Sequence, residues 1–258
     1  MMSGFPWFTQ ATFPEAIAAP LAVHLCAARL TYSGAALFDG LDLELAGGSF
    51  TGLLGPSGVG KSSLLRLLAG LTSPGISGEL RGGDDQSLQG RVAYMAQQDL
   101  LLPWLNVLEN VTLGNRLRGE KADAQRALHL LEQVGLADAA LTRPDRLSGG
   151  MRQRAALART LMEDRPVVLM DEPFSSLDAL TRLRLQALSA RLLAGRTVLL
   201  VTHDPLEALR MGDHILIMNG RPATLSALAD LPGAPPRDPG DPAVQEAYRA
   251  ILRLLEAV

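Results

Sequence analysis

The chain has 258 residues, of which 24 are Lys or Arg and 27 are Asp or Glu, giving a formal net charge of −3. This balance argues against a broad basic surface for nucleic acid, and no apolar run reaches the roughly 18 residues that a membrane-spanning helix requires. The single cysteine, Cys26, permits no internal disulfide, which is typical of a reducing compartment. The length predicts one large domain or two small ones with a proper core.

The N-terminal part is expected to hold a loose leader followed by strands. Residues 1–20 lack a basic start and are broken by prolines, so they do not resemble a secretion signal, and the protein is expected in the cytoplasm. Apolar and polar residues alternate over Val23–Tyr32 and Leu41–Leu45, which predicts half-buried antiparallel strands. The apolar run Phe50–Leu54 predicts a further strand.

The turn after that strand carries the pattern G-x-x-x-x-G-K-[ST], followed by an amphipathic helix. Glycines let backbone N–H groups turn inward on an anion, and the helix start adds unpaired N–H groups and the positive end of its dipole. Lys61 would reach the β- and γ-phosphates, and the Ser62 hydroxyl would bind Mg²⁺. Lysine occurs only twice in the chain, which makes a chance match rare. We predict a nucleotide-binding loop at Gly55, Pro56, Ser57, Gly58, Val59, Gly60, Lys61, Ser62 and Ser63.

The rest of the chain alternates between helices and short strands. The period is helical over about residues 106–135, and another helix is expected from its N-cap, Ser148, to about Glu163. Two apolar runs, Pro166–Met170 and Thr197–Val201, flank a helical stretch and predict parallel strands buried on both faces. A strand at Ile215–Met218, a proline-rich linker at Leu231–Pro242 and a short amphipathic helix at Val244–Val258 are expected to follow.

A buried strand that ends in two carboxylates, VVLMDEP at residues 167–173, supplies a second element of phosphate chemistry. The carboxyl end of a parallel strand is where a Mg²⁺-bound carboxylate belongs, so Asp171 is predicted to hold the metal, directly or through water. Glu172 is then placed to orient or deprotonate an attacking water. Taken alone, the pair fits a solvated strand end equally well; its position after a phosphate-binding loop favours the metal site.

The third element is LSGGMRQR at residues 147–154, in which a serine and two glycines at a helix start form a second anion cradle. The order of phosphate loop, glutamine loop, LSGG, DEP and histidine resembles the ATPase subunit of ATP-binding cassette (ABC) transporters over about residues 25–220. The resemblance implies an α/β P-loop NTPase fold, with a RecA-like parallel-sheet core, an antiparallel β subdomain and an inserted helical subdomain at about 99–164. The chain divides into a leader at 1–20, an ATPase domain at 21–230, and the linker and C-terminal helix at 231–258.

The resemblance implies a head-to-tail homodimer. Each ATP, with its Mg²⁺, would lie between the phosphate loop of one subunit and Ser148, Gly149 and Gly150 of the other, because one chain cannot bring both anion cradles to the same phosphates. Met151 stands where many members of the family carry glutamine. We expect a mild effect of this difference, because backbone amides supply the contacts.

Further residues receive roles from the resemblance. Gln97, in YMAQQD, matches the glutamine that approaches Mg²⁺ and the attacking water, with Gln98 as a weaker choice. His203, in LLVTHD, matches the histidine that hydrogen-bonds the γ-phosphate. Tyr32 stands where an aromatic ring stacks on adenine, and Asp178, in FSSLD, matches the aspartate that couples the two active sites. The expected catalytic residues are thus Glu172, His203 and Gln97, and the expected metal ligands are Ser62, Gln97 and Asp171.

In the family that this chain resembles, the segment after the glutamine loop is where a membrane subunit inserts a short helix; here it is LLLPWLNVLENV at residues 100–111. Leu101, Leu102, Trp104 and Leu105 could line an apolar groove for a helix of a membrane subunit, or simply pack the helical subdomain. Together with LSGGM, this segment resembles the ATPase sequences of importers of the nitrate, sulfonate and taurine group, which includes importers of a pyrimidine thiamine precursor. The implied partners are two integral membrane permease subunits and, indirectly, a periplasmic or lipoprotein solute-binding protein, with the ATPase on the cytoplasmic face of the inner membrane.

Other functions share some of these motifs. An exporter or lipid-extraction ATPase would carry every ATP-site residue. A soluble ABC ATPase acting on DNA or ribosomes is disfavoured by the acidic balance and by the short spacing between Lys61 and the LSGG motif, which leaves no room for a long coiled coil. A module that binds ATP without turnover would not need both Glu172 and His203.

Overall fold

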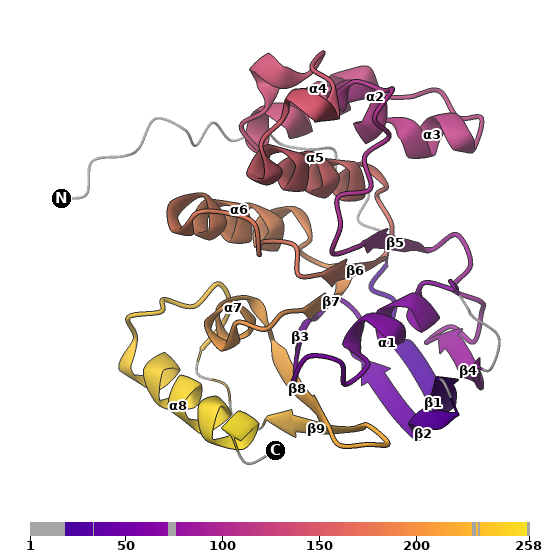
Figure 1. Ribbon diagram of the computed structural model, residues 1–258, viewed down its shortest axis with the longest axis vertical. Helices are drawn as coiled ribbons and strands as arrows, with labels where there is room; N and C mark the ends of the chain where they lie inside the picture. Colours follow the sequence, from indigo (N-terminus) through magenta and orange to yellow (C-terminus); the bar gives the residue numbers. More distant parts are fainter. Residues whose placement is uncertain (1–18, 33, 72–75, 229–230, 232, 257–258) are drawn as a thin grey trace.

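The computed structural model describes residues 19–32, 34–71, 76–228, 231 and 233–256, so the predicted leader lies almost entirely outside the described residues (Figure 1). The strands are β1 (Val23–Tyr32), β2 (Ala35–Leu45), β3 (Phe50–Leu54), β4 (Ile76–Gly82), β5 (Val92–Met95), β6 (Val167–Asp171), β7 (Thr197–Val201), β8 (His214–Asn219) and β9 (Thr224–Leu228). The α-helices are α1 (Lys61–Leu68), α2 (Val107–Val111), α3 (Leu113–Leu117), α4 (Ala124–Gln133), α5 (Gly149–Met162), α6 (Ala179–Leu192), α7 (Pro205–Met211) and α8 (Pro242–Glu256).

A six-stranded sheet with the order β5-β6-β7-β3-β8-β9 forms the centre of the fold. The strands from β5 to β8 in this order pair in parallel, and β9 pairs antiparallel with β8. Every residue of β3, β6 and β7 is buried, which confirms the prediction of parallel strands covered on both faces. The loops that follow the parallel strands therefore meet at one edge of the sheet.

Alternate residues of the central strands face two different cores. Val168 and Met170 of β6 pack with α2, α4 and α5, whereas Val167 and Leu169 pack with α1 and the strands β1 and β2. Residues of β7 divide between the two cores in the same way. The helices α1 and α5 consequently lie on opposite faces of the sheet.

The second sheet is antiparallel, with the order β2-β1-β4. The strand predicted at Val23–Tyr32 is β1, and the one predicted at Leu41–Leu45 is the C-terminal half of a longer strand, β2. Leu41, Leu43 and Leu45 are buried and alternate with exposed residues, so one face of this sheet packs against α1.

The helical region at the top of Figure 1 is divided more finely than the sequence period predicts. Over residues 106–135 the chain forms α2, α3 and α4. Asn106 and Glu109 form a capping box that starts α2, with both side-chain-to-backbone bonds at 2.8 Å. The hydroxyl of Thr112 donates to the Leu108 carbonyl at 2.9 Å where α2 ends, because a threonine hydroxyl competes for helix carbonyls.

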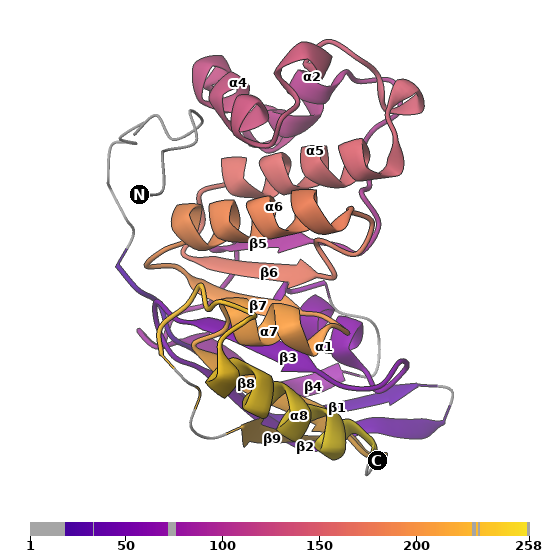
Figure 2. The same ribbon diagram turned by 90° about the vertical axis from the view of Figure 1, so that its left-hand side faces the viewer.

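Helix α8 lies against α7, as Figure 2 shows. Val244 and Ile251 of α8 are buried in a third core with Leu209 of α7 and with β8. In the segment predicted as a linker, the side chain of Arg237 is buried and donates to the carbonyls of Leu209 and Gly212 at 2.8 and 2.6 Å. The described part of this segment is therefore held to the end of α7.

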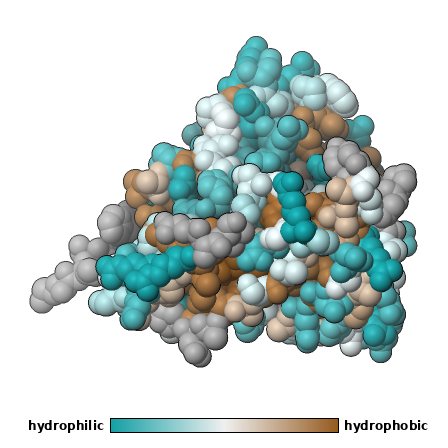
Figure 3. Space-filling view, turned by 60° about the horizontal axis from the view of Figure 1, so that its bottom comes forward, coloured by the Kyte–Doolittle hydropathy of each residue, from teal (hydrophilic) through white to brown (hydrophobic). Residues whose placement is uncertain are grey.

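The described residues include no helix that is long and apolar enough to cross a membrane. The lower side of Figure 1, turned forward in Figure 3, carries hydrophobic residues near its centre and hydrophilic residues around its rim. Large exposed apolar side chains also occur in the helical region, where Trp104 is 65% exposed.

Candidate functional site

The predicted phosphate-binding loop runs from the end of β3 to the start of α1, as the sequence pattern requires. Gly55 has a φ of 153°, and a Cβ atom there would lie 2.2 Å from the Met218 carbonyl oxygen. Gly60 has a φ of 117°, and its Cβ would lie 2.8 Å from the ring of Phe38. Glycine is therefore needed at both ends of the loop, for backbone conformation and for space.

Lys61 is buried and folds back over this loop. Its Nζ donates to the carbonyls of Gly55 and Pro56 at 2.7 and 2.9 Å. Burial lowers the pKa of the lysine, while the nearby carboxylates of Glu172 and Asp171 raise it. The ammonium group is thus held at the loop, where it adds positive charge to the inward-turned backbone.

Ser62 and Asp171 meet beside the phosphate-binding loop. Burial raises the pKa of Asp171, the last residue of β6, and a hydrogen bond from the Ser62 hydroxyl lowers it. A carboxylate and a hydroxyl are the oxygen ligands that Mg²⁺ accepts, with water and phosphate oxygens completing its shell. Among the described residues there is no cluster of three His, Cys, Asp or Glu side chains suited to a metal. This pair therefore fits a metal that substrate oxygens help to bind.

Glu172 lies between the other two predicted catalytic residues. Gln97 Nε2 donates to Glu172 Oε2 at 3.2 Å, and His203 Nδ1 lies 3.3 Å from Glu172 Oε1. These residues follow β5, β6 and β7, which are neighbours in the sheet, so topology alone brings them to one edge. Glu172 has a φ of 48°, which is a strained value for a residue with a side chain. Its backbone N–H nevertheless donates to the carbonyl of Val201 in β7 at 2.9 Å.

The LSGG motif lies elsewhere in the fold. Ser148 Oγ accepts a bond from the Met151 amide at 3.2 Å, so the prediction that Ser148 caps α5 is confirmed. Gly149 and Gly150 form the first turn of α5. Because α5 and α1 belong to cores on opposite faces of the sheet, the motif lies away from the phosphate-binding loop and Lys61.

Three further residues were predicted for the site: Asp178, Tyr32 and Gln98. Asp178 caps α6 by accepting from the Thr181 amide at 3.0 Å, and this hydrogen bond lowers the pKa of Asp178. Tyr32 ends β1, and its side chain lies outside the described residues. Gln98 is exposed next to Gln97.

Sequence reasoning missed a glutamine that ties α5 to the loop after β6. Gln153 is buried, and its Nε2 donates to the carbonyls of Pro173 and Glu172 at 3.0 and 3.3 Å. It thus holds the backbone that carries Glu172. The only sequence signal was an amide side chain two residues after the LSGGM stretch, on what proved to be a buried helix face.

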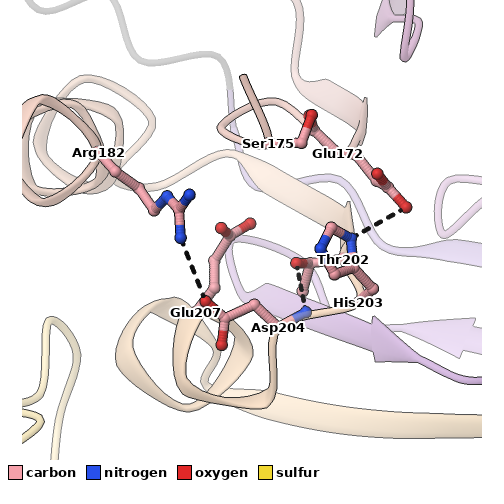
Figure 4. Close-up of a pocket in the computed structure, with 7 residues that line it drawn as sticks. All are labelled: Glu172, Ser175, Arg182, Thr202, His203, Asp204 and Glu207. Carbon is pink, nitrogen blue, oxygen red and sulfur yellow. Dashed lines mark hydrogen bonds and ion pairs between the residues drawn. The ribbon is translucent and has the colours of Figure 1, made fainter. Parts of the chain in front are cut away.

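A small pocket, with a cavity volume of about 20 Å³, is lined in part by Glu172 and His203 (Figure 4). The residues that line it are Glu172, Ser175, Arg182, Thr202, His203, Asp204 and Glu207. Glu207 is 5% exposed, and burial, followed by the charge of Asp204, raises its pKa to about 7. Gln186 on α6 donates to Glu207 Oε2 at 3.3 Å, so α6 and α7 are joined across the pocket.

The loop between β5 and α2 separates the four predicted groove residues. Leu101 is buried in the helical core, whereas Trp104 is 65% exposed and Leu102 and Leu105 are half-buried. Arg159 of α5 fixes the loop from below by donating to the carbonyls of Asp99 and Leu100.

One mainly parallel sheet positions a phosphate-binding loop, a pair of carboxylates at a strand end and a helix that begins with the LSGG motif. This combination defines the class of ATP-binding cassette proteins. Residues 38–175 match the family described as ABC transporter, and the chain belongs to that family. It is 46% identical over 237 residues to the aliphatic sulfonates import ATP-binding protein of Delftia acidovorans, a match that covers 91% of this chain and 94% of that protein. It is 47% identical over 214 residues to a protein of the same description from Rhodococcus jostii, covering 81% and 83%.

A solved structure extends the likeness to the fold. The chain is similar, with a TM-score of 0.72 and 31% identity, to a dimeric ATP-binding cassette in a post-hydrolysis state bound to ADP and Pi. The match covers 82% of this chain and 100% of that one.

Proposed function

We propose that this chain is the ATP-hydrolysing subunit of a bacterial ABC importer and that Glu172, Gln97 and His203 form its hydrolytic centre. The observation that carries the proposal is the contact of Glu172 with both Gln97 and His203, beside the loop that holds Lys61. A carboxylate that lies between an amide and an imidazole, at the sheet edge that also carries the phosphate-binding loop, is suited to activating water.

The residues divide the chemistry of hydrolysis among them. The amides of the loop from Gly55 to Ser63 and the ammonium of Lys61 bind the β- and γ-phosphates. Glu172 accepts the proton of the water that attacks the γ-phosphorus, Gln97 orients that water, and ADP leaves as the bond to the β-phosphate breaks. His203 donates a hydrogen bond to the γ-phosphate. Tyr32 is assigned to stacking on adenine.

Mg²⁺ is the cofactor that we expect with ATP. Ser62 and Asp171 would hold it, with Gln97 near its water shell, and the ion would neutralise charge on the phosphate oxygens when bound. The influence of the Ser62 hydroxyl on the pKa of Asp171 supports this assignment, because it means that two hard oxygen ligands lie near each other beside the phosphate loop.

The working form is proposed to be a head-to-tail homodimer. The phosphate loop opens α1 and the Ser148–Gly150 turn opens α5, and these helices cover opposite faces of one sheet. A second copy is therefore needed to bring Ser148, Gly149 and Gly150 to the nucleotide on the first, with Asp178 coupling the two sites. The dimeric cassette that resembles this chain is consistent with such an assembly.

The dimer is proposed to bind two membrane permease subunits at the cytoplasmic face of the inner membrane. Trp104 and the exposed Leu100 present apolar surface in the loop after Gln97, which supports a docking site for a permease helix. We assign residues 21–230 to the ATPase domain, with its helical subdomain at about 99–164, and residues 231–258 to a C-terminal extension. A solute-binding protein would deliver the cargo outside the membrane.

The cargo is proposed to be an aliphatic sulfonate, because relatives that cover most of this chain carry that description. The decisive experiment reconstitutes the chain in vesicles with a permease that co-purifies with it and measures ATP-dependent uptake of a labelled alkanesulfonate. Uptake that requires ATP and is lost in Glu172→Gln supports the proposal. ATP hydrolysis without uptake of any sulfonate would exclude the cargo, and the absence of hydrolysis would exclude the function.

A further inference from the structure

Arg182, on the first turn of α6, contacts two loops that belong to different parts of the site. Its Nη2 donates to the Leu177 carbonyl at 3.1 Å, and its Nη1 lies 3.7 Å from Asp204 Oδ2 (Figure 4). Leu177 directly precedes Asp178, and Asp204 directly follows His203. One guanidinium group therefore joins the loop after β6 to the loop after β7.

Asp204 is firmly placed at its end of this link. Its Oδ1 accepts from the Leu206 amide at 2.9 Å and so caps α7, and its own amide donates to the Thr202 hydroxyl at 3.0 Å. Only Oδ2 is directed to the arginine. Because His203 lies between Thr202 and Asp204, a shift of Asp204 moves the imidazole as well.

The other end is placed by the turn that follows Glu172. The Leu177 amide donates to the Phe174 carbonyl at 3.3 Å, Leu177 is buried, and Asp178 caps α6. The carbonyl that Arg182 holds is thus part of a short, well-bonded segment. This segment leads from Glu172 to the residue proposed to face the second subunit.

The pocket beside this link leaves polar atoms without partners. Among the described side chains, Arg182 Nε and Glu207 Oε1 are buried and make no hydrogen bond, and both residues line the pocket. The charged groups that face the guanidinium are therefore Asp204 and Glu207 from α7 and its cap, with Glu172 across the pocket. Among the described residues, the arginine has one carboxylate partner within 4 Å, Asp204, and at 3.7 Å this contact is long enough to shorten.

We propose that Arg182 is a positioning residue that couples the Asp178 segment to His203 within one subunit. The inference rests on the proposed roles of Asp178 and His203. When the partner subunit engages Asp178, Arg182 transmits the position of that segment to Asp204 and sets the imidazole next to Glu172. Arg182 itself does not touch the nucleotide.

The test is a double-mutant cycle in ATP turnover, measured on the chain assembled with its permease. Arg182→Gln removes the charge, and Asp204→Asn keeps the Oδ1 cap of α7 while removing the charged partner. Each variant is expected to lower kcat about tenfold and to change KM for ATP by less than about twofold, and the double variant is expected to be no slower than the worse single one. Arg182→Lys should recover part of kcat, and the Hill coefficient for ATP should fall toward one in Arg182→Gln.

Arg184→Gln is the matched control, because Arg184 is exposed on the same helix; its kcat should equal that of the unmodified protein. Multiplicative effects in the cycle, or unchanged kcat in Arg182→Gln, would overturn the inference. Should Arg182→Gln fail to fold, as judged by circular dichroism, the comparison of Asp204→Asn with Arg182→Lys decides: both must reduce kcat with KM retained. His203→Ala is measured in parallel, because full turnover in that variant would instead refute the proposed role of His203.

Discussion

Gln97 and Glu172 meet through a hydrogen bond of 3.2 Å although 75 positions separate them in the chain. The contact exists because β5 and β6 are parallel neighbours whose carboxyl ends share an edge of the sheet. The proposed base and the residue proposed to orient its water are thus already together in the folded chain.

Replacement of Glu172 by glutamine should separate binding from turnover. The amide cannot accept a proton, so phosphate release is expected to fall at least about 100-fold, while ATP affinity changes by less than about threefold. The ATP-loaded variant should elute as a dimer in size-exclusion chromatography. Glu246→Gln, at an exposed position of α8, is the control and should behave like the unmodified protein. Normal turnover in Glu172→Gln would remove Glu172 from its proposed role.

Replacement of Lys61 by alanine should weaken nucleotide binding. The variant loses the ammonium charge and its two bonds to the loop carbonyls, so we expect the Kd for ATP to rise at least about tenfold, measured by isothermal titration calorimetry. The exposed Lys121 is the chain's only other lysine, and Lys121→Ala should bind ATP normally. Equal affinities in the two variants would contradict the assignment of the phosphate loop.

The buried Glu207 predicts a pH-dependent stability. Its carboxyl has a pKa of about 7 in the folded protein, against an ordinary value of 4.5, so the folded state holds the proton more tightly. Its contribution is most favourable below pH 4.5 and is lost as the pH rises to about 7. Between about pH 5.5 and 8, ionisation of Glu207 should therefore lower the unfolding free energy of the unmodified protein by about 2 kcal/mol. Glu207→Gln lacks this loss, so the stability difference between the two proteins should grow by the same amount in favour of the variant.

Urea denaturation of both proteins at the two pH values measures this difference. Asp204 and Arg182 are the nearest charged groups and are retained in the variant, so the change reports on Glu207. Glu246→Gln should show no such pH-dependent gain. A constant difference between Glu207→Gln and the unmodified protein would mean that the carboxyl is already ionised at pH 5.5.

Truncation of Trp104 tests the proposed permease contact. The indole is 65% exposed, so Trp104→Ala should change the unfolding free energy by less than about 0.5 kcal/mol and leave ATP hydrolysis by the isolated chain intact. Co-purification with the permease and ATP-dependent uptake should both decrease. Leu141→Ala, at a residue 78% exposed in the same helical region, is the control. Unimpaired uptake in Trp104→Ala would place the permease contact elsewhere.

The sequence predicted most of the residues that lie in contiguous motifs. The phosphate loop, the DEP strand end and the LSGG helix cap can be recognised because their chemistry requires neighbouring residues on a strand, turn or helix start. Arg182, Gln153 and Glu207 could not be found in this way, because each acts through contacts between elements that only the sheet order brings together. The four apolar residues after Gln97 were equally ambiguous: burial places Leu101 in the core and Trp104 at the surface.

The placement of α1 and α5 on opposite faces of one sheet has a genetic consequence for the proposed dimer. A copy defective only in Lys61 and a copy defective only in Ser148 would together build one intact nucleotide site, since the damaged halves fall in the same composite site. The two defects placed in a single copy would spoil both sites even beside a normal partner. An inactive allele with a defect at Lys61 and an inactive allele with a defect at Ser148 should therefore partly restore function when they are co-expressed.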